Sequence, residues 1–405
     1  MEKWAGLTGT STTTDPSTMF LLQNYWWIII AVLGGLFILM TMVQGGQSLL
    51  HTAKDDIEER AMINSLGRKW ELTFTTLVMF GGALYAAFPL FYSVSFGGAY
   101  WVWMLILFGF VLQAVSYEYI NNPNNLIGKN AYKAFLYFNG VVAIVLVGAA
   151  VATFFTGSNF TFDPATRVLE WGTAADGFNL RGLEAALDFG HGAWFNLAFG
   201  ILVFAIARLL GALWLINDID NNEFSELIAR IRATAKKCFV VFLVALVIVL
   251  FGLVTMDGYA YDIHTGLVSI EPNKYLHNLL AGYGIQLIIF LAGAVLFLLG
   301  IYKSILTDKD NKGIIFSGLG AVLIGIIVFT LAGLNGTAFY PSYADLQSSL
   351  TIQNTSGSEA TLWVMTGVSV AVPFVLGYIA YVWYQMKKGG PITKEELEDP
   401  ESHAY

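Results

Sequence analysis

The sequence predicts an all-α polytopic membrane protein with nine membrane-spanning helices, and three observations support this fold class. The 405 residues are 56% hydrophobic and only 12% charged, whereas roughly a quarter of the residues in soluble domains are charged. The apolar residues form long continuous runs, without the strict alternation of a β-barrel strand. The basic residues gather in alternate loops, as they do in membrane proteins.

The apolar runs are long enough for transmembrane helices. A hydrocarbon core about 30 Å thick requires roughly 20 predominantly apolar residues per helix. The segments that meet this requirement are 26–44, 72–96, 99–120, 133–155, 191–216, 238–256, 278–302, 313–334 and 361–385.

The order of these segments predicts an internal repeat. Spans one to four and spans five to eight each read as helix, long charged segment, two helices, short turn, helix. We therefore expect two four-helix bundles, residues 26–155 and 191–334, and a peripheral ninth helix. The remaining units are an N-terminal segment 1–25, a loop 156–190, a loop with the ninth helix 335–385, and a tail 386–405.

One charged segment, 217–237, also contains an apolar stripe. Phe224, Leu227, Ile228 and Ile231 follow the i, i+3, i+4, i+7 spacing of one helix face. Because basic residues follow, this helix is predicted either to lie along the membrane surface or to pack on its neighbours.

The distribution of Lys and Arg predicts the orientation. Sixteen of the 21 basic residues fall in loops on one side, and four on the other. The positive-inside rule then places the N-terminus outside and the C-terminus in the cytoplasm. Since the basic residues follow the topology and form no single patch, the net charge of -8 gives no indication of nucleic-acid binding.

Polar residues inside the spans gather in the half nearest the basic loops. They are Gln44, Gln47, Glu71, Gln113, Glu118, Asn139 and Arg208. Carboxylates that exchange protons, amides that order water and a nearby cation are what a proton inlet from the cytoplasm would use. The competing interpretation is that Glu71 and Glu118 are ordinary solvated helix ends and that Arg208 reaches the interface with its long side chain.

Haem and metal binding by this chain are not expected. Haem iron needs axial ligands such as His or Met inside the bundle, yet only His191 of the five histidines begins a span. The single cysteine, Cys238, excludes an intrachain disulfide and a multi-thiolate site. The P-loop and dinucleotide-binding signatures are also absent from the sequence.

Several motifs together resemble one known family. They are "ERAMINSLGRKWE", "GGALYAAFPLFYSVSFGGAY", "LIARIRATA", "MDGY", "SLTIQNTSGSEATLWVMT" and "ITKEELE". The chain is similar to subunit II of the cytochrome bd quinol oxidases, collinearly over nearly its whole length. The resemblance implies a haem-free subunit in a prokaryotic cytoplasmic (inner) membrane, within a complex that oxidises quinol and reduces dioxygen to water by four electrons with cytoplasmic protons.

The same resemblance implies a haem-containing partner. Subunit I of the family carries haem b, haem d and the quinol site, and no cofactor is expected on the present chain. The resemblance leaves room for a structural quinone and for small accessory subunits, with membrane lipid around the complex. Two alternatives remain open: a purely structural or assembly subunit of this complex, and a secondary transporter, which usually has helices broken in matching positions near the midplane.

The resemblance also assigns the candidate site residues. The family places an acidic residue after the Trp that begins the second span, and Glu71 follows Trp70 here. Glu118 matches a family Asp, so the expected proton inlet consists of Glu71 supported by Glu118 and Arg208. The sequence departs from the family at Gln44 and Gln47, which replace an acidic pair, and at Thr73, which replaces an Asn.

Overall fold

The computed structural model describes residues 16–122, 125–172, 182, 183, 187, 189–387 and 390–398. Most of the segment 1–25, part of the loop 156–190 and the end of the tail 386–405 therefore lie outside the described residues. The α-helices are α1 Pro16–Met40, α2 Met42–Gln47, α3 Asp56–Gly67, α4 Trp70–Ala87, α5 Pro89–Phe91, α6 Tyr100–Tyr119, α7 Lys129–Phe138, α8 Ile144–Thr156, α10 Ala193–Asp218, α11 Ser225–Thr255, α12 Lys274–Leu280, α13 Ile285–Ile301, α14 Gly313–Gly333, α15 Ile352–Thr355, α16 Glu359–Ser369, α17 Val372–Lys387 and α18 Lys394–Glu398.

Shorter elements connect these helices. Two antiparallel hairpins pair β1 Phe160–Asp163 with β2 Val168–Trp171, and β3 Gly258–Tyr261 with β4 Val268–Glu271. Turns of π-helix occupy Tyr92–Gly98, Asn139–Ala143 and Tyr302–Leu306. Turns of 3-10 helix occupy Leu50–Thr52, Phe189–His191, Gly282–Gly284 and Leu346–Ser348.

The described part of the chain contains eight helical segments that are long and apolar enough to cross a membrane, or nine if one bent pair counts as a span. The bent pair corrects the second predicted span, 72–96. Its first helix, α4, ends at Ala87, and the helical segment that starts at Pro89 turns away by 117°. Proline has no N–H and disfavours helical geometry in the residue before it, so the helix breaks at Phe88.

Helix α11 decides between the two interpretations of the stripe in 217–237. The helix begins at Ser225 and continues without interruption through the predicted span to Thr255. Leu227, Ile228 and Ile231 are all buried. The stripe therefore packs on its neighbours instead of lying along the membrane surface.

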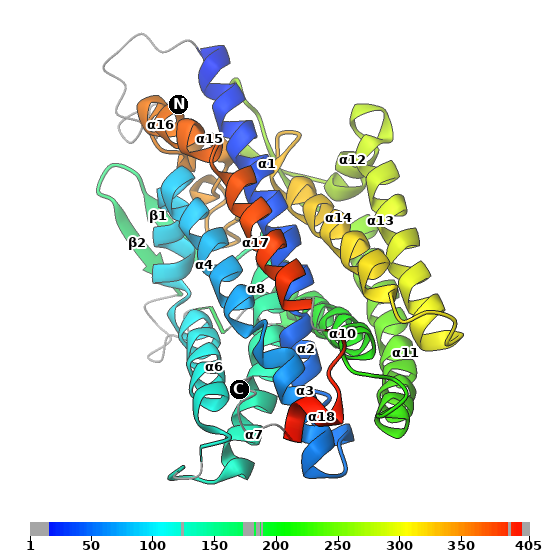
Figure 1. The fold of residues 1–405 in the computed structure, drawn as a ribbon. Helices are drawn as coiled ribbons and strands as arrows, with labels where there is room; N and C mark the ends of the chain where they lie inside the picture. Colours follow the sequence, from blue (N-terminus) through cyan, green and yellow to red (C-terminus); the bar gives the residue numbers. More distant parts are fainter. Residues whose placement is uncertain are drawn as a thin grey trace.

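Helices α1 and α10 form the centre of the molecule (Figure 1). Helix α1 packs along α14 and α4, whereas α10 packs along α8, α11 and α2. Close approach of α10 and α2 depends on glycine, because a Cβ on Gly45 would lie 1.8 Å from the carbonyl oxygen of Ala207. Since α1 packs on α14 and α10 packs on α8, the two halves of the chain share an extensive interface.

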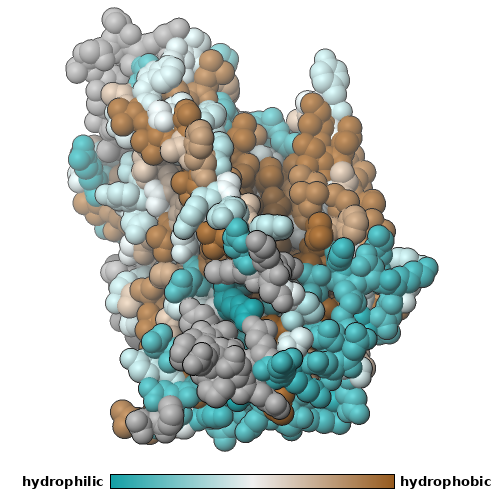
Figure 2. All heavy atoms as spheres, viewed as in Figure 1, coloured by the Kyte–Doolittle hydropathy of each residue, from teal (hydrophilic) through white to brown (hydrophobic). Residues whose placement is uncertain are grey.

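The two ends of the helices differ in chemistry. One end, here called the basic end, carries the segments 48–69, 120–133, 217–237 and 302–313, and ion pairs join Arg230 to Glu58 and Lys133 to Glu59. The opposite end carries both hairpins and a cluster of packed aromatic rings that includes Trp27, Phe91 and Phe339. Figure 2 shows hydrophilic residues gathered at the basic end and hydrophobic residues exposed over α13 and α14.

Candidate functional site

Four buried amide side chains meet inside the bundle near the basic end. Gln44 and Gln47 lie on α2, Gln113 lies on α6, and Asn139 begins the π-helical turn between α7 and α8. All four side chains are fully buried. We call this group the amide cluster, and it contains four of the polar residues that the sequence placed in this half of the membrane.

Hydrogen bonds join α2 to α6 across the amide cluster. Gln44 Nε2 donates to Gln113 Oε1 at 3.0 Å, and Gln47 Nε2 donates to the hydroxyl of Tyr117 at 3.1 Å. Both hydrogen bonds can form together because Gln44 and Gln47 are three residues apart on α2 and Gln113 and Tyr117 are four apart on α6. Residues at these spacings lie on one face of a helix. Gln44 and Gln47 therefore face Gln113 and Tyr117, one pair above the other.

Five polar atoms of the amide cluster have no hydrogen-bond partner among the described residues. They are Gln44 Oε1, Gln47 Oε1, Gln113 Nε2, and both Oδ1 and Nδ2 of Asn139. Leaving a buried polar group unpaired costs about 1–3 kcal/mol, and buried groups of this kind commonly bind ordered water. These atoms are therefore available to bind ordered water.

Glycines bring the backbones close enough to form the amide cluster. In the sequence "VQGGQS", a Cβ on Gly45 would collide with α10, and one on Gly46 would lie 2.4 Å from the side chain of Leu66 on α3. On the other side, a Cβ on Gly140 would lie 2.6 Å from the carbonyl oxygen of Gln44. The glycines thus serve helix packing, whereas the two glutamines face α6.

Glu71 and Glu118 are each next in sequence to one of two stacked aromatic rings. Glu71 follows Trp70 and Glu118 follows Tyr117, and the rings of Trp70 and Tyr117 stack with centroids 6.0 Å apart. Both glutamates are exposed on this chain. Because Tyr117 accepts the hydrogen bond from Gln47, the ring pair connects the surface beside the glutamates to the amide cluster.

Thr73 anchors the beginning of α4 beside this site. Its hydroxyl donates to the carbonyl oxygen of Met40 at 2.9 Å, where α1 ends and α2 begins. Carbonyl groups at the end of a helix lack partners within that helix, so this bond satisfies one of them. Thr73 departs from the family pattern. Its hydrogen bond ties the start of α4 to the junction of α1 and α2, just before Gln44.

Within the described residues, Arg208 contacts neither glutamate. Its Nε is buried without a hydrogen-bond partner, and its guanidinium lies 5.8 Å from the centre of the Phe204 ring on the same helix. The structure thus brings the four amides together with Tyr117 and Trp70 but leaves Arg208 elsewhere. The two aromatic residues were missed in the sequence, although Tyr117 lies four residues after Gln113 on the same helix face.

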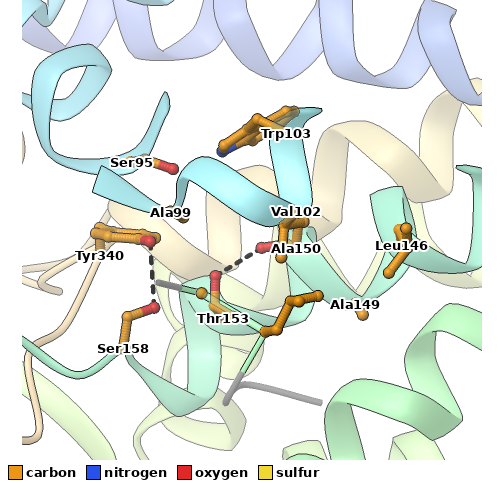
Figure 3. Close-up of a pocket in the computed structure, with 12 residues that line it drawn as sticks. Ser95, Ala99, Val102, Trp103, Leu146, Ala149, Ala150, Thr153, Ser158 and Tyr340 are labelled. Atoms are coloured by element: carbon orange, nitrogen blue, oxygen red, sulfur yellow. Dashed lines mark hydrogen bonds between the residues drawn. The ribbon is translucent and has the colours of Figure 1, made fainter. Parts of the chain in front are cut away.

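Two cavities in the described part of the chain have mainly apolar linings. A small cavity of about 20 Å³ lies near the opposite end between α6 and α8, where Ser158 donates to the Tyr340 hydroxyl (Figure 3). This volume suits about one water molecule. A larger apolar cavity of about 340 Å³ is lined by residues of α10, α11, α13 and α14, among others. Within the described residues, no three His, Cys, Asp or Glu side chains are grouped to hold a metal ion.

Comparison with known proteins identifies the family. A sequence profile described as "Cytochrome bd terminal oxidase subunit II" matches residues 22–386. The chain is 29% identical to the cytochrome bd-I ubiquinol oxidase subunit 2 of Escherichia coli K12, over 93% of this chain and 97% of the relative. It is 24% identical to the cytochrome bd ubiquinol oxidase subunit 2 of Bacillus subtilis, over 91% and 96% of the two chains.

A solved structure has the same fold. A chain of the bd oxidase from Geobacillus thermodenitrificans superposes with a TM-score of 0.61 at 12% sequence identity, covering 93% of the present chain and all of the solved one. The profile match spans nearly every described helix, from α1 to α17. The chain belongs to the cytochrome bd terminal oxidase subunit II family.

Proposed function

We propose that this chain is the haem-free subunit of a bacterial inner-membrane quinol oxidase and that a partner subunit I carries haem b, haem d and the quinol site. Membership of the subunit II family carries this proposal. The four described histidines support it, because His51, His191, His264 and His277 all lie in turns or short helices at the ends of the long helices. Family membership leaves the secondary-transporter alternative without support.

A difference spectrum tests the division of cofactors. The complex is purified through a tag on this chain, and its reduced-minus-oxidised spectrum is recorded before and after the partner is removed. We expect haem b and haem d bands in the complex and none in the isolated chain. Haem bands that remain with the isolated chain, in stoichiometric amount, would contradict the proposal.

The proposed orientation places the basic end in the cytoplasm. Ion-paired and unpaired Lys and Arg residues concentrate there, and the positive-inside rule then assigns that side. In this orientation the two four-helix bundles cross the membrane side by side, and α16 and α17 form the peripheral ninth span. Subunit I, lipid and any small accessory subunits would cover the apolar faces that remain exposed.

We further propose that Glu71 is the cytoplasmic entry of a proton route, with Glu118 as a second carboxylate beside it. Both side chains are exposed at the basic end, and each follows directly one residue of the ring pair that leads to the amide cluster. The unpaired amide atoms would order water behind the carboxylates. A Glu carboxylate can take a proton from water and release it again, and water held by amides can carry it onward.

The direction of this route follows from the face of α4 that carries Glu71. Glu71, Thr75, Val78 and Tyr85 form one exposed stripe along that helix. Glu71 therefore faces away from the core of this chain. We infer that protons enter at the junction with subunit I, so that both subunits line the route to the haem site.

Substitution of Glu71 tests the proton role. In the purified complex, Glu71→Gln should lower quinol oxidase turnover by about tenfold or more, because an amide cannot transfer the proton. Glu71→Asp should restore most of the rate. The matched control is Glu226→Gln, which removes the same charge from a side chain that is 86% exposed at the basic end. Equal turnover of the Glu71→Gln and Glu226→Gln complexes, with normal haem spectra, would count against the inlet.

A structural or assembly role of the chain remains the alternative, because amides replace the acidic pair at Gln44 and Gln47. The apolar cavity of about 340 Å³ bears on the structural quinone that the family resemblance leaves room for. Its lining is almost wholly hydrocarbon, and the hydroxyl of Thr41 in its wall already donates to the carbonyl of Ile38. The cavity therefore fits a hydrocarbon tail better than a quinone head group.

A further inference from the structure

Arg208 lies on an outward-facing stripe of α10. Trp194, Leu197, Ile201, Phe204 and Arg208 are spaced by three or four residues, and all of them are exposed or half-buried. We call these residues the α10 stripe. The next positions on the same face, Ala212 and Leu215, are fully buried. Arg208 is thus the last residue of this outward-facing surface, because the residues that follow on the same helix face are covered by the rest of the chain.

The two sides of the α10 stripe are formed by α8 and α11. Gly200 on one side packs against α8, since a Cβ there would lie 2.6 Å from the carbonyl oxygen of Val145. On the other side, Cys238 of α11 contacts the carbonyl oxygen of Ala205. At the basic end, Arg230 of α11 reaches across to the carbonyl of Thr52 at 2.9 Å and to Glu58. This bridge joins α11 to the segment after α2.

The contact between Cys238 and Ala205 also places a second basic residue near Arg208. Helices α10 and α11 are consecutive and antiparallel, so Arg208 lies level with α11 residues about one turn before Cys238. Lys237 is seven residues from Arg230 and therefore shares its helix face, the face from which Arg230 reaches the segment after α2. Lys236 is exposed as well, but it points about 100° away around the helix.

Arg208 and Lys237 have no acidic partner among the described residues, in contrast to three other basic residues of the basic end. Arg230 pairs with Glu58 and Glu226, Arg232 with Asp308, and Lys133 with Glu59. No ion pair of Arg208 or Lys237 is present among the described residues. A charge in the inner half of a membrane is costly unless it is paired or reaches an aqueous or headgroup layer. A counter-anion at the lipid surface would remove this cost.

We propose that Arg208 and Lys237 form a binding site for the phosphate of an anionic phospholipid in the cytoplasmic leaflet. The guanidinium would hold two phosphate oxygens in its planar fork, and the ammonium group would add a second positive charge. The acyl chains would lie along Phe204, Ile201 and Trp194. Basic pockets between transmembrane helices on the cytoplasmic side are the usual setting for lipid headgroups. The site requires the basic end to face the cytoplasm, but not proton transfer through Glu71.

Native mass spectrometry of the intact complex tests this site. The delipidated complex is titrated with dioleoyl phosphatidylglycerol, and the bound lipid is counted for the wild type and for three variants. We expect Arg208→Gln to weaken the tightest binding step by about tenfold, as for the loss of one charge-assisted contact, and Lys237→Gln to weaken it to a lesser degree. Lys236→Gln, the matched control with the same charge loss on another face, should bind as the wild type does.

Three results would overturn the proposal. The first is unchanged lipid binding in Arg208→Gln, which would show that a carboxylate of another subunit neutralises Arg208. The second is equal weakening by Lys236→Gln and Lys237→Gln, which would show only a diffuse positive surface. The third is displacement of the lipid by millimolar inorganic phosphate, which would identify a site for the free anion. If Arg208→Gln fails to assemble, the comparison of Lys237→Gln with Lys236→Gln decides.

Discussion

Asn139 has two polar side-chain atoms that are buried without a protein partner, and this makes it a sensitive probe of the amide cluster. If water binds these atoms, Asn139→Leu removes the amide that holds the water and leaves its neighbours less well satisfied. We expect a loss of about 1–3 kcal/mol in the stability of the complex, measured as a lower midpoint of thermal unfolding. If Asn139→Leu is more stable than the wild type, the amide cluster binds no water, because Leu then replaces a polar group that has no partner.

Glu271 provides a residue-scale prediction about pH at the opposite end. His277 Nδ1 lies 2.8 Å from Glu271 Oε1 and Lys274 Nζ lies 2.9 Å from Oε2. The hydrogen bond from His277, followed by that from Lys274, lowers the pKa of Glu271 below its ordinary value of 4.5. A lowered pKa contributes stability above the ordinary value, and this stability is lost as the pH falls through the folded-state pKa.

Hydrogen exchange of the segment 258–277 between pH 3 and pH 6, corrected for intrinsic rates, measures this effect. The wild type should lose protection as the pH falls below 4.5. Glu271→Gln should show a flatter profile with less protection at pH 6. The same acid profile in both proteins would show that Glu271 does not couple the hairpin β3–β4 to α12.

The polar residues of the site were visible in the sequence, but their partners were not. Intramembrane amides and charges are rare enough to be found by inspection, so Gln44, Gln113 and Asn139 could be named in advance. Tyr117 and Trp70 resemble the many other aromatic residues of the chain, and only the structure shows their stacking. The outward direction of Arg208 also depends on which helices flank α10, which one sequence cannot reveal.

At the scale of elements, the contact between α2 and α10 depends on glycine. A Cβ on Gly45 would meet backbone atoms of Ala207, which cannot move aside as a side chain could. Gly45→Ala should therefore cost about 3 kcal/mol through overpacking and lower the yield of assembled complex. Gly82 of α4 is the matched control, since nothing lies within 4 Å of its added Cβ.

Gly82→Ala should leave the yield and the unfolding temperature unchanged, or raise stability by up to about 1 kcal/mol, because Ala favours the helix. Both variants are compared by the amount of haem d that co-purifies with the tagged chain. Equal yields of the two would show that the α2–α10 contact relaxes easily. Equal yields would also argue against a role of the α2–α10 contact in positioning the amide cluster.

Hydropathy located most of the helices but not their interruptions. The mean hydropathy of a sequence window does not depend on whether the helix bends. The sequence therefore predicted one continuous span where the structure has a 117° bend at Phe88. The Pro at position 89 was the available signal. For α11, charged residues on the exposed face concealed that the helix predicted in 217–237 continues without interruption into the span 238–256.

At the scale of the whole molecule, the orientation can be tested independently of activity. Cys238 is only 8% exposed, so a single introduced cysteine dominates thiol labelling, and a Cys238→Ala background removes the rest. Ile263→Cys, in the loop between β3 and β4, should react with an impermeant maleimide in intact spheroplasts. Glu226→Cys, at the basic end, should react only after the membrane is opened. The reverse pattern would invert the proposed topology.

The internal repeat was predicted from the rhythm of loops, and the structure adds that the two halves are interlocked through α1 and α10. If the chain were divided into two halves at residues 156–190, the surfaces of α10 and α14 that pack on the first half would become exposed. The partition into two bundles stays a prediction about topology. The extent of their shared interface depends on packing glycines such as Gly45 and Gly200, whose partners lie far away in the sequence.

Proton uptake in a single turnover tests the central claim most directly. The fully reduced complex is reconstituted in liposomes with a pH indicator on the basic-end side, and a pulse of dioxygen starts the reaction. We predict that the wild type takes up protons from that side and that Glu71→Gln slows this uptake by about tenfold or more, whereas Glu226→Gln does not. Uptake by Glu71→Gln at the wild-type rate and from the same side would contradict the assignment of Glu71 as the proton entry.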